Sequence, residues 1–122
     1  MTLLLVALGA VVGAPLRYLT DRLIQARHDT IFPWGTLTVN VAGSLIMGFL
    51  GGAAAAGRLD PMILTVLGPG FCGALTTYST FGYETHRLAE DGSRFLAAAN
   101  VALNLLAGLG AAFIGVAIAA SL

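Results

Sequence analysis

Long apolar stretches alternate with short polar segments along the whole chain. The apolar stretches run from about Leu3 to Leu19, Phe32 to Gly57, Pro61 to Tyr83 and Phe95 to Leu122. Because a helix needs roughly 20 mostly apolar residues to cross a bilayer, this pattern predicts an all-α integral membrane protein. We expect residues 1–122 to form a single domain of four transmembrane helices. The predicted connections are Asp21–Ile31, Arg58–Asp60 and Glu84–Arg94.

The third apolar stretch carries a break in its middle, over Gly73–Phe81. Gly68, Pro69 and Gly70 weaken a helix just before this segment. A bilayer core has no water to bind free backbone groups, so non-helical backbone survives there only where it is buried in protein or lines a polar path. The hydroxyl-rich break therefore indicates an ion site or a pore.

Composition supports membrane residence and excludes several classes of protein. Hydrophobic residues make up 57% of the chain and charged residues only 10%, against about 25% charged residues in a typical soluble domain. The formal net charge is zero, so no basic nucleic-acid surface is expected. The single cysteine, Cys72, cannot form an internal disulfide and is expected to pack. The first stretch has no basic leader region and is interpreted as a retained helix.

Small residues recur along the predicted helices. Gly9 and Gly13 are spaced four apart in the first stretch, and Gly108 and Gly115 lie in the fourth. Helices in lipid associate through close contacts that small residues allow. Since four short helices bury little surface among themselves, a partner subunit is expected. Trp34, at the entrance to the second stretch, suits an interfacial anchor.

Three asparagines lie within the apolar stretches. Helical spacing places Asn40 on one face with three small or polar residues, Thr36, Gly43 and Ser44. Asn100 and Asn104 are four residues apart in the fourth stretch. An amide in hydrocarbon needs partners, which interhelical hydrogen bonds or a polar pathway would supply. The three amides and the hydroxyl run together favour the pathway.

The break itself offers two kinds of ion chemistry. Carbonyls freed near Gly73 and Thr76 suit a small hard cation, and Thr77, Ser79 and Thr80 add hydroxyls. The rings of Tyr78 and Phe81 could present their electropositive edges to an anion. From spacing alone, ordinary core packing of these two rings is favoured.

Few charged groups lie near the spans. Arg17 could reach back to the interface or give a pore mouth a positive potential, and Glu84 could be solvated or lie in a vestibule. No His, Asp or Glu lies deep in a span, so a proton relay has no carrier. His28 and His86 are expected on surface loops. No nucleophile, base or metal-ligand cluster forms a catalytic pattern, so an enzyme is not expected.

At these positions the chain resembles the Fluc (CrcB) family of bacterial fluoride channels, over essentially its full length. The resemblance rests on three segments in order, Gly13–Tyr18, Gly35–Ser44 and Gly70–Phe81. It implies a fluoride-specific channel in the bacterial cell membrane that exports cytoplasmic fluoride passively and reduces its toxicity. It also implies a dual-topology dimer, in which two antiparallel subunits flank two fluoride paths.

The resemblance also implies roles for individual residues. Carbonyls of Gly73 and Thr76 from both subunits would hold a structural Na+, which is not transported. The remaining positions form the fluoride path and the vestibules. The path would comprise Asn40, Tyr78, Ser79, Thr80, Phe81 and Asn104, with Arg17 and Glu84 near the mouths.

Two features depart from the family pattern. Tyr78 stands where a phenylalanine is expected. Four arginines lie in the first and third connections and only Arg58 in the second, which favours one orientation in the membrane. A homodimer is preferred, and a heterodimer with an oppositely inserted homologue stays open.

Two other functions compete with the channel. A small multidrug/proton antiporter can also be a four-span antiparallel dimer, but it needs an embedded carboxylate that the first span lacks. A non-transporting assembly subunit would leave the broken third span without a purpose.

Overall fold

The computed structural model describes residues 2–27, 32–76 and 79–122, without the side chains of Ser79 and Thr80. Every regular element among these residues is helical. The elements in chain order are α1 (Thr2–Ala26), α2 (Trp34–Ala55), α3 (Pro61–Thr65), η1 (Val66–Cys72), α4 (Gly73–Leu75), α5 (Ser79–Glu90) and α6 (Arg94–Ser121). The predicted all-α class is confirmed.

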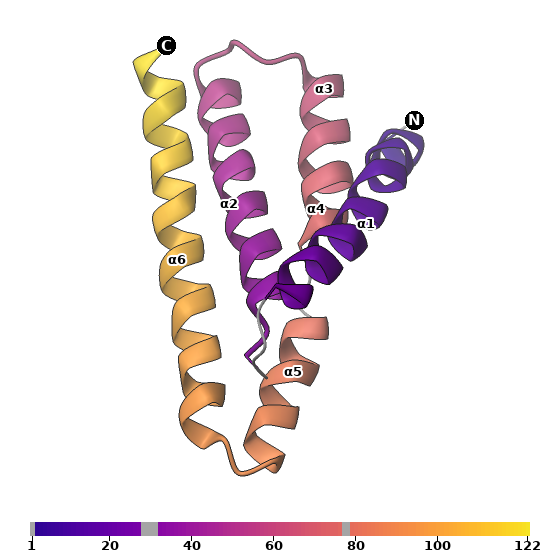
Figure 1. The fold of residues 1–122 in the computed structure, drawn as a ribbon. Helices are drawn as coiled ribbons and strands as arrows, with labels where there is room; N and C mark the ends of the chain where they lie inside the picture. Colours follow the sequence, from indigo (N-terminus) through magenta and orange to yellow (C-terminus); the bar gives the residue numbers. More distant parts are fainter. Residues whose placement is uncertain (1, 28–31, 77–78) are drawn as a thin grey trace.

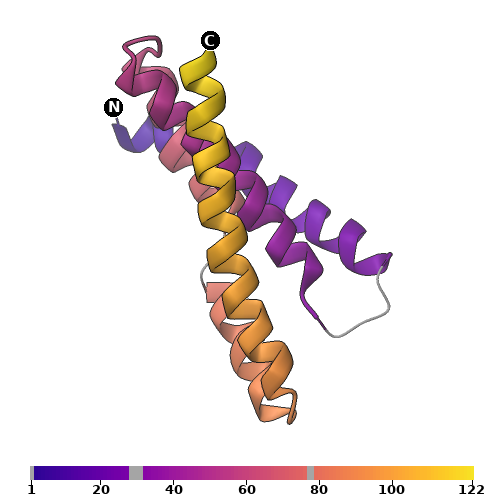
Figure 2. The ribbon, with the colours of Figure 1, turned by 90° about the vertical axis from the view of Figure 1, so that its left-hand side faces the viewer.

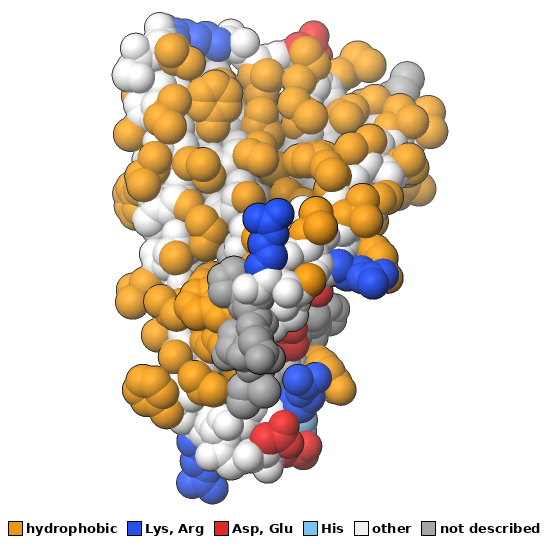
Figure 3. Space-filling model, viewed as in Figure 1, with side chains coloured by type: hydrophobic (Ala, Val, Ile, Leu, Met, Phe, Trp, Pro, Cys, Tyr) orange, Lys and Arg blue, Asp and Glu red, His pale blue; other side chains and the backbone are white. Residues whose placement is uncertain are grey.

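Three of the helices are long and apolar enough to cross a membrane, namely α1, α2 and α6. The apolar helix over Pro61–Leu75 is shorter, and at 1.5 Å per residue it rises roughly 22 Å. That is less than the roughly 30 Å of a bilayer core. Hydrophobic side chains cover most of the upper part of the face in Figure 3, while charged side chains lie mainly lower down and at the upper rim. The chain is a membrane protein.

The helices pack in a branched arrangement rather than a parallel bundle. In Figure 1, α2 lies between α6 and the column formed by α3, η1 and α4, while α1 crosses obliquely and packs on η1. Helix α5 pairs with the N-terminal half of α6. Figure 2 shows that this α5–α6 pair diverges from the C-terminal half of α1 and the start of α2.

Glycines lie where helix backbones approach one another closely. On the α2–α6 interface, Gly48 lies against the backbone of Ala112, and Gly115 lies against the backbone of Leu45 and Phe49. Gly9 meets the η1 backbone in the same way. Close backbone approach lets apolar helices gain van der Waals contact in lipid, so these glycines pack helices as their pattern predicts.

The third apolar stretch is interrupted where the sequence predicts. Pro69 has no N–H and its ring crowds the preceding turn, and the helix around it widens to the π-helical turns of η1. The helix ends at Leu75, and Thr76 has an extended backbone with ψ of 161°. Because α5 begins at Ser79, the break lies inside the predicted segment 73–81.

Two predicted connections are wrong in part, because helix continues beyond the apolar residues. Helix α1 continues to Ala26 and α5 to Glu90. Backbone hydrogen bonding needs no apolar side chains, and polar pairs one turn apart support it. In α1 the Arg22 guanidinium donates to the Tyr18 hydroxyl at 3.2 Å. His86 therefore lies on a helix and not in a loop, although its side chain is exposed as expected.

Short turns follow the C-terminal ends of α2 and α5. Gly57 and Gly92 adopt positive φ values of 71° and 83°, a conformation that glycine reaches without a Cβ clash. On the far side of the first turn, the Asp60 carboxylate accepts from the Met62 N–H at 2.7 Å and caps α3.

We predict that Gly115→Ala destabilises the protein by about 1–3 kcal/mol, the usual cost of overpacking. The added Cβ would run into the α2 backbone at Leu45 and Phe49. Thermal unfolding in detergent measures the effect. Gly110→Ala is the matched control, because a Cβ at Gly110 on the same helix meets nothing within 4 Å. Equal stability of the two variants would contradict the proposed packing.

Candidate functional site

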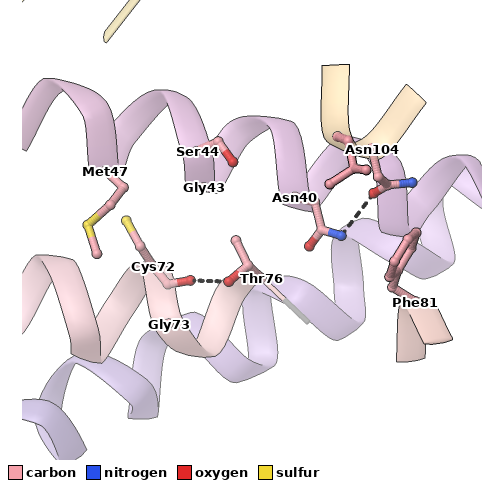
Figure 4. Close-up of a pocket in the computed structure, with 10 residues that line it drawn as sticks. Asn40, Gly43, Ser44, Met47, Cys72, Gly73, Thr76, Phe81 and Asn104 are labelled. Atoms are coloured by element: carbon pink, nitrogen blue, oxygen red, sulfur yellow. Dashed lines mark hydrogen bonds between the residues drawn. The ribbon is translucent and has the colours of Figure 1, made fainter. Parts of the chain in front are cut away.

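A cavity of about 270 Å³ lies where α2, η1, α4, α5 and α6 meet. Its lining combines amides, hydroxyls, sulfur atoms and one aromatic ring. The residues are Asn40, Gly43, Ser44, Met47, Cys72, Gly73, Thr76, Phe81, Asn104 and Leu105. Figure 4 shows Asn40, Asn104 and Phe81 at one end of the cavity, and Met47 and Cys72 at the other.

The break brings several predicted site residues to this cavity. Asn40 on α2, Phe81 on α5 and Asn104 on α6 line it together with two residues of the break, Gly73 and Thr76. These five positions are spread over 65 residues of chain. Only the packing of the helices brings them together.

Other predicted site residues lie elsewhere or outside the description. Arg17 on α1 and Glu84 on α5 do not line the cavity. Tyr78 and Thr77 lie outside the described residues. Ser79 and Thr80 begin α5, but their side chains are not described. The roles assigned to all of these residues stay predictions.

The three asparagines form one hydrogen-bonded series. Asn40 Nδ2 donates to Asn104 Oδ1 at 3.0 Å, as drawn in Figure 4. Asn104 Nδ2 donates to the side-chain and backbone oxygens of Asn100 at 2.9 and 2.8 Å. Asn100, fully buried with 0% exposure, donates through Nδ2 to Thr85 Oγ1 at 2.8 Å. The amides therefore bridge α2, α6 and α5, and two of them also line the cavity.

Backbone oxygens gather at the break. The Cys72 carbonyl accepts from both the N–H and the hydroxyl of Thr76, each at 2.9 Å. Gly73 lies in the last turn of its helix, where carbonyls lack the usual partner four residues on. Carbonyl oxygen is the donor that small hard cations prefer. Among the described residues no group of three His, Cys, Asp or Glu side chains could hold a metal.

Glu84 lies away from the cavity, in a cluster formed by three helices. Its Oε1 is buried with no hydrogen-bond partner among the described residues. Burial raises the pKa of the Glu84 carboxyl above its ordinary value of 4.5, and the Asp21 carboxylate raises it further. The Thr36 hydroxyl and the Arg87 guanidinium oppose this rise. Asp21 also lies against Gly35, so side chains from α1, the start of α2 and α5 come near one another here although the helices themselves diverge (Figure 2).

Comparison with known proteins identifies the family. The family model described as CrcB-like protein, Camphor Resistance (CrcB), matches residues 4–116. The chain belongs to the CrcB family.

Named relatives cover nearly the whole chain. A Streptomyces avermitilis protein named fluoride-specific ion channel FluC 1 is 61% identical over 116 residues, which cover 95% of this chain and 94% of the relative. A Frankia casuarinae protein of the same name is 60% identical, with coverage of 98% and 96%. A Mycobacterium tuberculosis protein named fluoride-specific ion channel FluC 2 is 44% identical, with coverage of 85% and 79%. These are names of ion channels and not of enzymes, as the sequence predicts.

Sequence reasoning missed some members of the site. Met47, Cys72 and Leu105 line the cavity, although their types signal only apolar packing, and Cys72 is indeed buried. Thr85 was not singled out, because a threonine in a helix usually bonds its own backbone. Its hydroxyl does so, donating to the Phe81 carbonyl at 2.9 Å, and it also accepts from Asn100. The bond from Asn100 to Thr85 becomes visible only in the folded structure, where the two side chains face each other.

We predict that Glu84→Gln raises stability at neutral pH. A carboxyl whose pKa is higher in the folded state is most favourable when protonated, so its contribution is present at low pH and is lost as pH rises through the folded pKa. The variant should melt above the parent near pH 7.5, and the difference should shrink toward pH 4.5. Asp91→Asn, at an exposed site just after α5, is the control. A gap that does not change with pH would contradict the assignment.

Proposed function

We propose that this chain forms a fluoride-specific channel in the bacterial cell membrane. The main support is its membership of the CrcB family, with full-length relatives named as fluoride-specific channels. The cavity adds chemical support, since amides and an aromatic ring converge there beside a helix break. Passive flow through the channel would release cytoplasmic fluoride and so reduce its toxicity.

The cavity lining suits a small, strongly hydrated anion. Fluoride must exchange its water for donors that hold it without trapping it. The amide N–H of Asn40 is such a donor, and the ring edge of Phe81 offers a weaker electropositive surface. Both lie at the same end of the cavity in Figure 4. We place the fluoride path there, continuing along Tyr78, Ser79 and Thr80, with Arg17 and Glu84 near the mouths.

We further propose that two antiparallel copies of the chain form the channel, each with four spans. The third span would run over Pro61–Tyr83 and contain the break. The cavity, which contains the polar groups of Asn40 and Asn104, reaches the surface of the single chain, because its lining residues Met47 and Leu105 are 41% and 56% exposed. Lipid cannot satisfy polar groups, so a second subunit is the favoured cover. A homodimer needs no further component, and a heterodimer with a homologue remains the alternative.

A structural Na+ at the dimer centre would complete the site. Carbonyls of Gly73 and Thr76 from each subunit are the proposed ligands, since both residues line the cavity at the end of a helix. The fixed positive charge would offset the cost of bringing an anion into a low-dielectric core.

We predict that Asn40→Ala and Phe81→Ile each slow fluoride flux while leaving assembly intact. The first removes a donor and the second an aromatic edge, so a fall of roughly tenfold is expected if about 1.4 kcal/mol of ion stabilisation is lost. A fluoride electrode outside fluoride-loaded liposomes measures the flux from the chain expressed alone.

Phe113→Ile is the matched control for these variants, because Phe113 is 74% exposed on α6 and lies away from the cavity. Parent protein that releases chloride as fast as fluoride, or that takes up cations in exchange for protons, would refute the channel. Normal flux in both cavity variants would refute the proposed path.

We also predict that Na+ is required for activity. Protein purified and reconstituted with a large organic cation in place of Na+ should conduct no fluoride, because the cation is too large for a carbonyl cage. Returning Na+ should restore the flux. Unchanged flux after complete exchange would show that no Na+ is needed at Gly73 and Thr76.

A further inference from the structure

One series of hydrogen bonds joins the cavity to a buried site on α5 and α6. We call the series Asn40, Asn104, Asn100 and Thr85 the amide ladder. Its four side chains lie on three helices, and each donates to the next group in one direction. Only Asn104 and Asn40 line the cavity.

The direction of the ladder is set by a group that can only accept. The Phe81 carbonyl accepts the single proton of the Thr85 hydroxyl. Thr85 Oγ1 must therefore accept from its other neighbour, which fixes Nδ2 of Asn100 toward it. The Oδ1 atom of Asn100 then faces Asn104.

Two hydrogen bonds fix the orientation of the Asn104 amide. Its Nδ2 donates to Asn100 Oδ1 at 2.9 Å and to the Asn100 backbone carbonyl at 2.8 Å. A reversed amide would place an oxygen against these two acceptors, which is unfavourable because buried polar atoms then lose their partners. Asn104 Oδ1 is thus left to accept from Asn40 Nδ2, and the donor end of Asn40 is fixed on the α6 side.

We propose that Thr85 and Asn100 are positioning residues that set the orientation of the Asn40 amide and thereby favour fluoride. This inference rests on the proposed fluoride path. An anion is attracted by the Nδ2 end of an amide and repelled by the Oδ1 end. Hydrogen bonds in series also polarise one another, which strengthens the Asn40–Asn104 bond that holds the amide in place. Neither Thr85 nor the fully buried Asn100 lines the cavity, so both act through Asn104.

The ladder also joins two groups at the same end of the cavity. It begins at the Asn40 amide and ends on the backbone carbonyl of Phe81. The ring and the amide proposed to meet the ion are therefore held in register by the same bonds.

The test is Thr85→Val, which keeps the shape of the side chain and removes the hydroxyl. Fluoride flux should fall by roughly three- to tenfold, the factor that corresponds to one net hydrogen bond, and the ratio of fluoride to chloride flux should fall with it. Thr85→Ser keeps the hydroxyl and should restore both values. Thr65→Val is the matched control. The Thr65 hydroxyl on α3 donates to the carbonyl four residues earlier, that of Pro61, at 2.9 Å, just as the Thr85 hydroxyl donates to the Phe81 carbonyl.

A second measurement needs no transport. In detergent, the side-chain amide resonances of Asn40 should move in Thr85→Val and stay in place in Thr85→Ser and Thr65→Val. Thr85→Ala removes the same hydroxyl if the valine variant does not fold. The inference is overturned if the Asn40 resonances do not move in Thr85→Val. It is also overturned if Thr85→Val has the flux and selectivity of the parent, measured per folded protein. Parent protein that conducts no fluoride would refute the proposed function, while the resonances would still decide the ladder.

Discussion

A bilayer core supplies no hydrogen-bond partners, and this constraint governs how the broken third helix can exist. Helix α4 ends at Leu75, Thr76 is extended, and α5 begins at Ser79; carbonyls in the last turn of a helix lack the usual N–H partner four residues on. Such backbone is stable at membrane depth only against protein or a polar cavity. Gly73 and Thr76 line the cavity among α2, α5 and α6, which meets this requirement for the proposed third span.

Glycine contacts determine where the polar groups meet. Gly9 draws α1 onto η1, and Gly48 and Gly115 bring α2 and α6 into backbone contact. With those helices held at close range, Asn40 and Asn104 reach each other at 3.0 Å. Longer side chains at the glycine positions would move the helix axes apart, and the amides would then lose a bond that lipid cannot replace. Apolar packing and polar pairing thus depend on each other.

The sequence predicts the helices, the break and much of the cavity because each has a local cause. Glycine and Pro69 weaken the helix, and Asn40 and Asn104 are polar where lipid is expected. Helix ends at Ala26 and Glu90 were missed because backbone bonding continues after apolar residues stop. Thr85 was missed because its partner, Asn100, is close only in the folded chain. Arg17 and Glu84 do not line the cavity, and their roles near the mouths of an ion path stay predictions.

Interhelical bonding and an ion path need not be alternative roles for the asparagines. A donor that is free to rotate would reorganise around each passing anion, and that reorganisation would cost part of the binding free energy. An amide already bonded on one side is held in place before the ion arrives. Asn104 supplies that bond to Asn40, and Asn100 supplies it to Asn104. The bonds that join the helices are therefore the same bonds that would prepare a fixed site for a small anion.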